Sequence, residues 1–110
     1  MIVTKNKTYT LIKPTQISAS QFFVEFKDCY KEFIGEHLII DISDKINVEI
    51  KEILLFLKLS VQHIKNGTSF VLVCGGISID DLPDELNVVP TFNEAIDILE
   101  MDAIERDLGF

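Results

Sequence analysis

The chain has 110 residues, of which 47% are hydrophobic and 25% charged, and its formal net charge is −8. This composition is typical of a folded protein, and we expect one domain over residues 1–110. The excess negative charge disfavours binding to DNA or RNA and leaves no basic helix for a membrane surface. Since we find no membrane-spanning run, no signal peptide and no disulfide framework, we expect a cytoplasmic protein.

The first third of the chain predicts a hairpin followed by a helix. Residues 2–5 and 8–13 are strand candidates on either side of an Asn6–Lys7 turn. Ser18 opens a capping box that ends at residue 21, with Ile17 and Phe22 as a hydrophobic staple. The helix is expected to end at Gly35 and to present one apolar face, formed by Phe22, Phe26, Cys29, Tyr30 and Phe33.

The middle of the chain predicts a strand, a helix and a second strand. Residues 38–42 and 70–74 are almost wholly apolar, as expected of strands that are buried on both sides of a sheet. We expect the helix between them to begin with Asn47 as its N-cap and to end before Asn66 and Gly67. Its expected core-facing stripe consists of Ile50, Ile53, Leu54, Leu57, Val61 and Ile64.

The last third predicts a short helix, a short strand and a final helix. Asp80 and Asp81 are expected to open the short helix, with Pro83 in its first turn, and residues 88–89 form the strand. Thr91 begins a second capping box, which opens the acidic final helix. The resulting order, β-β-α-β-α-β-α-β-α, predicts an α/β fold with a mixed, mostly parallel sheet covered by helices.

Three segments in this order resemble motifs of the STAS domain family. The segment 40–43, Ile-Asp-Ile-Ser, matches the end of the family's apolar strand. Asn66 and Gly67 look like its Gly-rich turn before the next strand, and residues 92–95, Phe-Asn-Glu-Ala, look like the opening of its last helix. The family includes bacterial anti-sigma-factor antagonists and the cytoplasmic tails of sulfate transporters. The resemblance implies a STAS-like fold and a regulatory role through protein binding.

The chain departs from the family pattern at the start of the middle helix. Counting on from Ser43 without a gap places Glu49 at the family's Asp, and Ile50 and Lys51 at its two Ser positions. In the antagonists the second Ser is phosphorylated by a partner kinase, which switches off binding. Because neither Ile50 nor Lys51 has a hydroxyl, we expect the chain to lack this phospho-switch.

No group of residues in the sequence predicts catalysis, a metal site or a cofactor. His37 and His63 are the only histidines, neither has partners at metal-ligand spacing, and we expect both at the surface or at a strand edge. The serines have no recognisable nucleophile setting, and the acidic run from Asp80 to Glu85 is interpreted as a solvated helix start. We therefore expect a protein without enzyme activity.

Gly75 and Gly76 provide an alternative interpretation. They follow a predicted parallel strand, and ligands of open α/β sheets bind at the carboxyl ends of such strands. A small-ligand or nucleotide sensor at this crevice is therefore a second hypothesis. No phosphate-binding fingerprint accompanies the two glycines, so a tight turn is the simpler interpretation.

A second apolar row on the middle helix points to a partner. This row consists of Val48, Leu55 and Leu59 and lies roughly opposite the expected core-facing stripe, with Phe56 beside it. It is covered either by flanking helices or by another molecule. In the STAS antagonists the face around the start of this helix meets an anti-sigma kinase. We predict a partner-binding surface for another protein, such as a kinase-like anti-sigma factor, or for a second copy in a homodimer, and its residues are Val48, Glu49, Lys51, Leu55 and Leu59.

Overall fold

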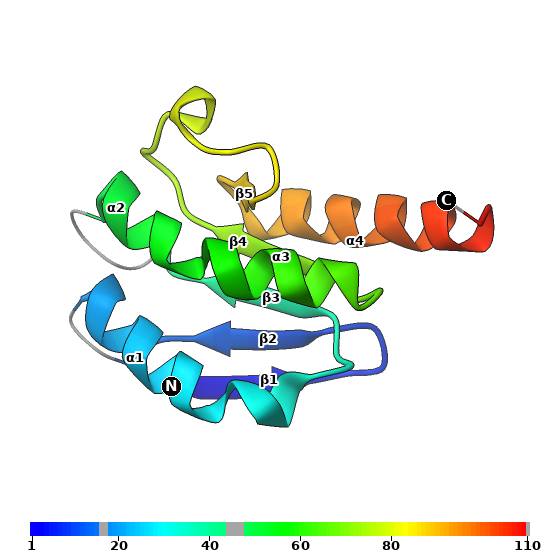
Figure 1. Cartoon of the computed structure of the whole chain (residues 1–110), viewed down its shortest axis with the longest axis horizontal. Helices are drawn as coiled ribbons and strands as arrows, with labels where there is room; N and C mark the ends of the chain where they lie inside the picture. The colour runs from blue at the N-terminus through cyan, green and yellow to red at the C-terminus, as the bar shows by residue number, and fades with distance from the viewer. Residues whose placement is uncertain (16–17, 44–47, 110) are drawn as a thin grey trace.

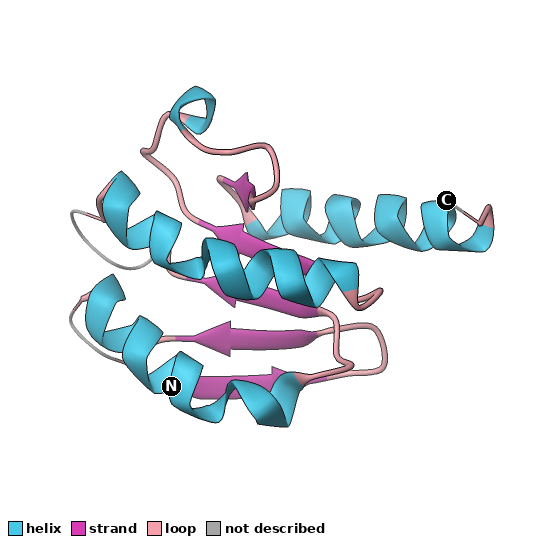
Figure 2. Ribbon diagram, viewed as in Figure 1, coloured by secondary structure: helices cyan, strands magenta, loops and turns pink. Residues whose placement is uncertain are grey.

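The computed structural model describes residues 1–15, 18–43 and 48–109, and in these residues five strands form one mixed sheet (Figures 1 and 2). The strands follow one another across the sheet in the order β1-β2-β3-β4-β5. Strand β1 is antiparallel to β2, and every other neighbouring pair is parallel. This confirms the predicted α/β class and mixed sheet. The strands are β1 (Ile2–Lys5), β2 (Thr10–Lys13), β3 (Leu38–Asp41), β4 (Phe70–Val73) and β5 (Asn87–Val89).

The turn between β1 and β2 is longer than predicted. The side-chain oxygen of Asn6 accepts hydrogen bonds from the backbone amides of Thr8 and Tyr9, at 2.8 and 2.9 Å. An Asn side chain bonded in this way fixes a turn rather than a strand. Strand β2 therefore begins at Thr10 and not at Thr8.

The helices lie on both faces of the sheet. Helix α1 and the following 3₁₀ helix η1 cover one face together with the run formed by α2, η2 and α3, whereas α4 packs against the other face (Figure 1). The predicted short helix near Asp80 is only the 3₁₀ turn η3, because Leu82, next to Pro83, has extended backbone. The helices are α1 (Ala19–Cys29), η1 (Tyr30–Phe33), α2 (Ile50–Ile53), η2 (Leu54–Phe56), α3 (Leu57–Lys65), η3 (Ile79–Asp81) and α4 (Phe92–Asp107).

Two of the predicted helix starts are confirmed, and a third is wrong. The Ser18 and Thr91 side chains accept the amides of Gln21 and Glu94 and so cap α1 and α4. Helix α2 begins at Ile50 with Glu49 as its N-cap, later than predicted. The expected N-cap Asn47 and the staple residue Ile17 lie outside the described residues. Among the described residues no helix combines the length and the hydrophobicity needed to cross a bilayer.

The core between the sheet and the α1/α3 layer is built from aromatic rings. Phe56 is fully buried, and the centres of the Phe22, Phe23 and Phe26 rings lie 6.0, 5.0 and 6.1 Å from its own. Such distances are in the favourable range for aromatic pairs. The opposite face has a smaller aliphatic core, formed by Ile39, Val71, Val73, Ala95 and Leu99.

The α2–α3 run is rotated relative to the prediction. It buries Ile53, Phe56, Ser60 and His63, whereas three residues of the predicted core-facing stripe remain 38 to 41% exposed: Leu54, Val61 and Ile64. Each exposed residue directly follows a buried one in the sequence. The expectation of a surface position for His63 is therefore also wrong. Phe56 is buried because it packs against the neighbouring phenylalanines. This orientation of the run places Leu54, Val61 and Ile64 toward solvent.

Candidate partner-binding surface

The start of α2 is held by a reciprocal cap and by a contact with α1. Glu49 and Glu52 form a capping box, in which Glu52 Oε1 accepts the Glu49 amide at 3.0 Å. The other oxygen of Glu52 accepts from the backbone and the hydroxyl of Ser20, at 3.2 and 2.9 Å. These hydrogen bonds, that from the Glu49 amide above all, lower the pKa of Glu52. Helix α2 is thus fixed relative to α1 at its first turn.

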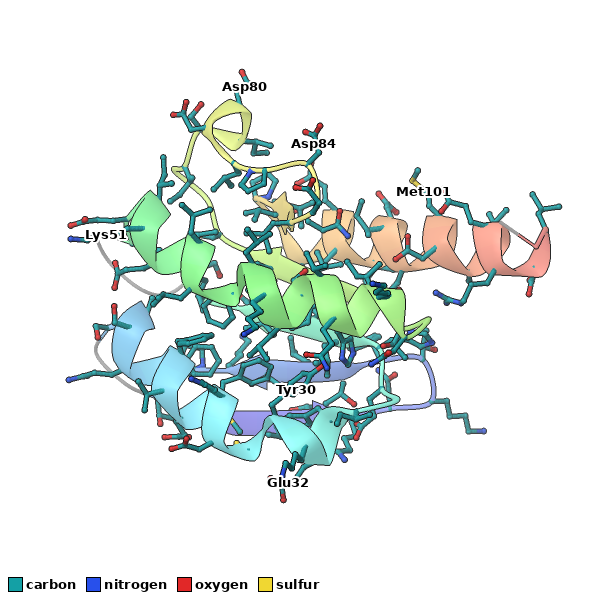
Figure 3. The ribbon with its side chains drawn as sticks, in the orientation of Figure 1. Tyr30, Glu32, Lys51, Asp80, Asp84 and Met101 are labelled. Atoms are coloured by element: carbon teal, nitrogen blue, oxygen red, sulfur yellow. The ribbon has the colours of Figure 1, made fainter. Side chains whose placement is uncertain are left out.

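The structure separates the predicted partner-binding residues into two groups. Glu49, Lys51 and Leu55 are exposed, and Lys51 projects from the free end of α2 (Figure 3). Lys51 Nζ lies 3.3 Å from Glu49 Oε2, and this solvent-exposed pair contributes little to stability. Val48 and Leu59 are half-buried and pack against the aromatic core. The predicted row is therefore part surface and part core.

A more regular apolar row lies on the α2–α3 run, among residues that the sequence assigned to the core. We call Ile50, Leu54, Leu57, Val61 and Ile64 the α2–α3 ridge. Their spacing of 4, 3, 4 and 3 residues is the heptad pattern by which one helix packs along another. Ile50 and Leu57 are half-buried at its base, and the other three are more than a third exposed.

The ridge borders a groove lined by both aliphatic and charged residues and has three lysines along one edge, of which Lys51 is paired with Glu49. The groove has a volume of about 330 Å³ and is lined by Val61, Ile64, Lys65 and Glu85, so it lies between α3 and the segment that leads into β5. Three exposed lysines, Lys51, Lys58 and Lys65, recur every seven residues beside the ridge. On a heptad pattern this spacing keeps all three on the same edge of the ridge.

The buried His63 is fully hydrogen-bonded. His63 Nε2 lies 2.6 Å from the carbonyl oxygen of Glu36, and Nδ1 lies 2.7 Å from Tyr30 Oη. Because a carbonyl only accepts, Nε2 carries the proton and Nδ1 accepts from the Tyr30 hydroxyl. Burial lowers the pKa of His63 and favours this neutral form. With both nitrogens engaged, the ring serves the fold and has no free atom for proton transfer.

The segment around Gly75 and Gly76 forms a turn without the features of a phosphate site. Gly76 has a φ of +76°, which explains the glycine by backbone conformation. The helix that follows, η3, has three residues, too few to present an anion-binding N-terminus. Asp80 and Asp84 project from this region into solvent (Figure 3), and their charge repels phosphate. Nothing in this geometry favours the nucleotide hypothesis.

The Asp41 carboxylate, at the end of the strand that resembles the STAS motif, organises the turn after β3. Its Oδ1 accepts from the amide and the hydroxyl of Ser43, at 2.9 and 2.5 Å. Lys13 Nζ lies 3.8 Å from Oδ2. Within residues 1–15, 18–43 and 48–109, no three His, Cys, Asp or Glu side chains are grouped so as to hold a metal ion.

Comparison with models of known protein families and with curated proteins finds no match to this chain. The arrangement of residues is therefore the basis for a functional conclusion. Sequence reasoning missed the ridge because the same aliphatic residues also satisfy a core-facing pattern. Two signals were nevertheless present: Phe56, a large side chain off the predicted stripe, and the lysines that recur every seven residues beside it.

Proposed function

We propose that this chain is a non-catalytic, STAS-like protein-docking module that binds an amphipathic helix along the α2–α3 ridge. Docking of a helix on an apolar groove is a common mode of recognition, in which residues at heptad spacing supply the anchors. The lysines beside the ridge would set the orientation and the charge of the helix that is accepted.

One observation carries the proposal: α3 buries Ser60 and His63 while the adjacent aliphatic residues Val61 and Ile64 are exposed. Ser60 and His63 are buried, and no hydrogen-bond partner of the Ser60 hydroxyl is found among the described residues. Val61 and Ile64, their neighbours, are 41 and 38% exposed. Burial of an unpaired hydroxyl costs about 1–3 kcal/mol, and exposed aliphatic groups forgo about 25 cal/mol per Å² of burial. At these two pairs of neighbouring positions, 60/61 and 63/64, stability alone would favour burial of the aliphatic residue.

The family resemblance supports a regulatory role without a phospho-switch. The segment that ends at Ser43 and the segment that starts at Phe92 look like STAS motifs, and the antagonists of that family meet their kinase around the start of the corresponding helix. Ile50 and Lys51 occupy the positions of the two serines. The Lys51 side chain is 79% exposed and has no hydroxyl that a kinase could phosphorylate. Docking by this module would therefore be constitutive.

Site-specific photo-crosslinking in living cells tests the proposal. A benzophenone amino acid is placed at position 61 or 64 of the full chain, and at position 24 as a control. Val24 is 59% exposed on α1, away from the ridge. We expect a discrete adduct from positions 61 and 64 that is absent from position 24. Absence of an adduct at both ridge positions, in protein that is folded by circular dichroism, would refute the proposal.

A further inference from the structure

The outward face of α4 is a second unpartnered apolar row. Met101, Ile104 and Leu108 are 57, 59 and 65% exposed, while Ala95 and Leu99 on the opposite side of the helix are buried. Met101 points away from the sheet (Figure 3), and the C-terminal part of α4 extends beyond the ends of the strands (Figure 1). Met101, Ile104 and Leu108 are spaced by three and then four residues, which is the same heptad pattern as on the α2–α3 ridge.

Acidic residues flank this row on α4. Glu100 and Asp107, which are both exposed and seven residues apart, lie along one edge, and Glu105 lies along the other. The one basic residue of α4, Arg106, is directed toward the sheet, where its Nη1 lies 3.5 Å from Ser69 Oγ. From Met101 to Leu108 the outward face of α4 is therefore apolar at its centre and negative at both edges, and the exposed Asp97, one turn before Met101, ends the apolar row.

We propose that α4 of a second copy of this chain is the helix that docks on the α2–α3 ridge. This inference rests on the proposed function, because it names the occupant of the same surface. The apolar row of α4 matches the heptad spacing of the ridge. Glu100 and Asp107 are seven residues apart, as are neighbouring lysines in the row Lys51, Lys58 and Lys65. Two neighbouring lysines can therefore pair with both acidic residues at once.

The positions of the two surfaces determine how such an assembly grows. The ridge and α4 belong to helices that cover opposite faces of the sheet. Ile64, at the end of the ridge, approaches α4 of the same molecule and lines a pocket with Asp102, Glu105 and Arg106, but the outward row of Met101, Ile104 and Leu108 is not part of that pocket. One molecule therefore does not place its own apolar α4 row on its own ridge. Contact between two ridges would oppose the lysine rows, and contact between two α4 faces would oppose carboxylates. The charges therefore favour a heterologous, head-to-tail contact, which produces rings or open chains rather than a two-fold dimer.

Complementation between two variants tests this arrangement. Ile64→Asp disables the ridge, Ile104→Asp disables α4, and Val24→Asp adds the same charge at an exposed position outside both surfaces. Each is examined by sedimentation velocity up to about 1 mM protein, the range of weak contacts. We expect wild type and Val24→Asp to self-associate, and each of the other variants alone to associate at least about 30-fold more weakly. An equimolar mixture of Ile64→Asp and Ile104→Asp should form a 1:1 dimer. This dimer should grow no further, because its one remaining ridge and its one remaining α4 face each carry an aspartate.

A charge reversal keeps the test valid where an aspartate variant does not fold. Lys58→Glu changes only an exposed side chain and should weaken self-association, and Glu100→Lys, mixed with it, should restore the contact. A monomeric wild type, or variants that fail to complement, would overturn self-docking. If positions 61 and 64 crosslink to a different protein, self-docking fails and the proposed function stands. If they crosslink to nothing, both fail.

Discussion

The rotation of the α2–α3 run gives a prediction that reverses the expectation from sequence. Phe56 lies off the predicted core-facing stripe but is fully buried, whereas Ile64 lies on that stripe but is 38% exposed. Replacing each with alanine in separate variants measures which residue the fold depends on. We expect Phe56→Ala to be much the more destabilising change.

The expected loss in the free energy of unfolding depends on what each side chain contacts. Truncation of a buried phenylalanine costs about 3–5 kcal/mol, and Phe56 loses contact with Phe22, Phe23 and Phe26. Ile64→Ala removes a side chain that is partly in water, and it should cost about 1 kcal/mol or less. Alanine has a higher helix propensity than phenylalanine or isoleucine. This gain therefore offsets the loss in free energy of unfolding by a similar amount in both variants. The difference of at least about 2 kcal/mol corresponds to a Tm difference of about 8 °C.

Urea unfolding followed by far-UV circular dichroism measures the two free energies. The experiment is run at low protein concentration, so that self-association does not add to the stability. Equal m-values for the two variants would show that the changes are in stability rather than in compactness. If Ile64→Ala proves as destabilising as Phe56→Ala, the observed rotation of α3 is refuted, and the ridge is core.

Three further predictions concern the cap, the turn and the buried histidine. Glu52→Ala removes the bonds to the starts of α2 and α1 and should lower the free energy of unfolding by about 1 kcal/mol in urea titration. Gly76→Ala should cost about 1 kcal/mol because its φ is +76°. Gly75→Ala should be close to neutral, since an added Cβ meets only Pro90 O at 3.9 Å; equal losses would contradict this. Burial lowers the pKa of His63 in the folded protein. Below about pH 6.5 the unfolded state therefore binds more protons than the folded state, and the free energy of unfolding should fall as pH drops from 7 to 5. His63→Gln should flatten this slope, and an unchanged slope would show that the proton is taken up elsewhere.

Much of the architecture is determined by local sequence. The Ser18 and Thr91 side chains cap their helices through hydrogen bonds that span only three residues. The local sequence is therefore enough to predict these caps. Strands β3 and β4 are apolar at every position or nearly so, which predicts burial on both faces of a parallel sheet. Where the prediction failed locally, at Thr8, the cause was an Asn6 side chain that competes with strand pairing.

The direction in which the α2–α3 run faces was decided only by tertiary structure. Its sequence offers two adjacent faces one residue apart, and the period of the helix does not distinguish between them. The choice depends on phenylalanines of α1, which surround Phe56, and on Tyr30 and Glu36, which bond His63 from 33 and 27 residues away. Sequence by itself determined the buried strands and the capped starts of α1 and α4, because these depend on local patterns. Contacts between distant elements determined which residues are exposed, because they set the direction in which each helix faces.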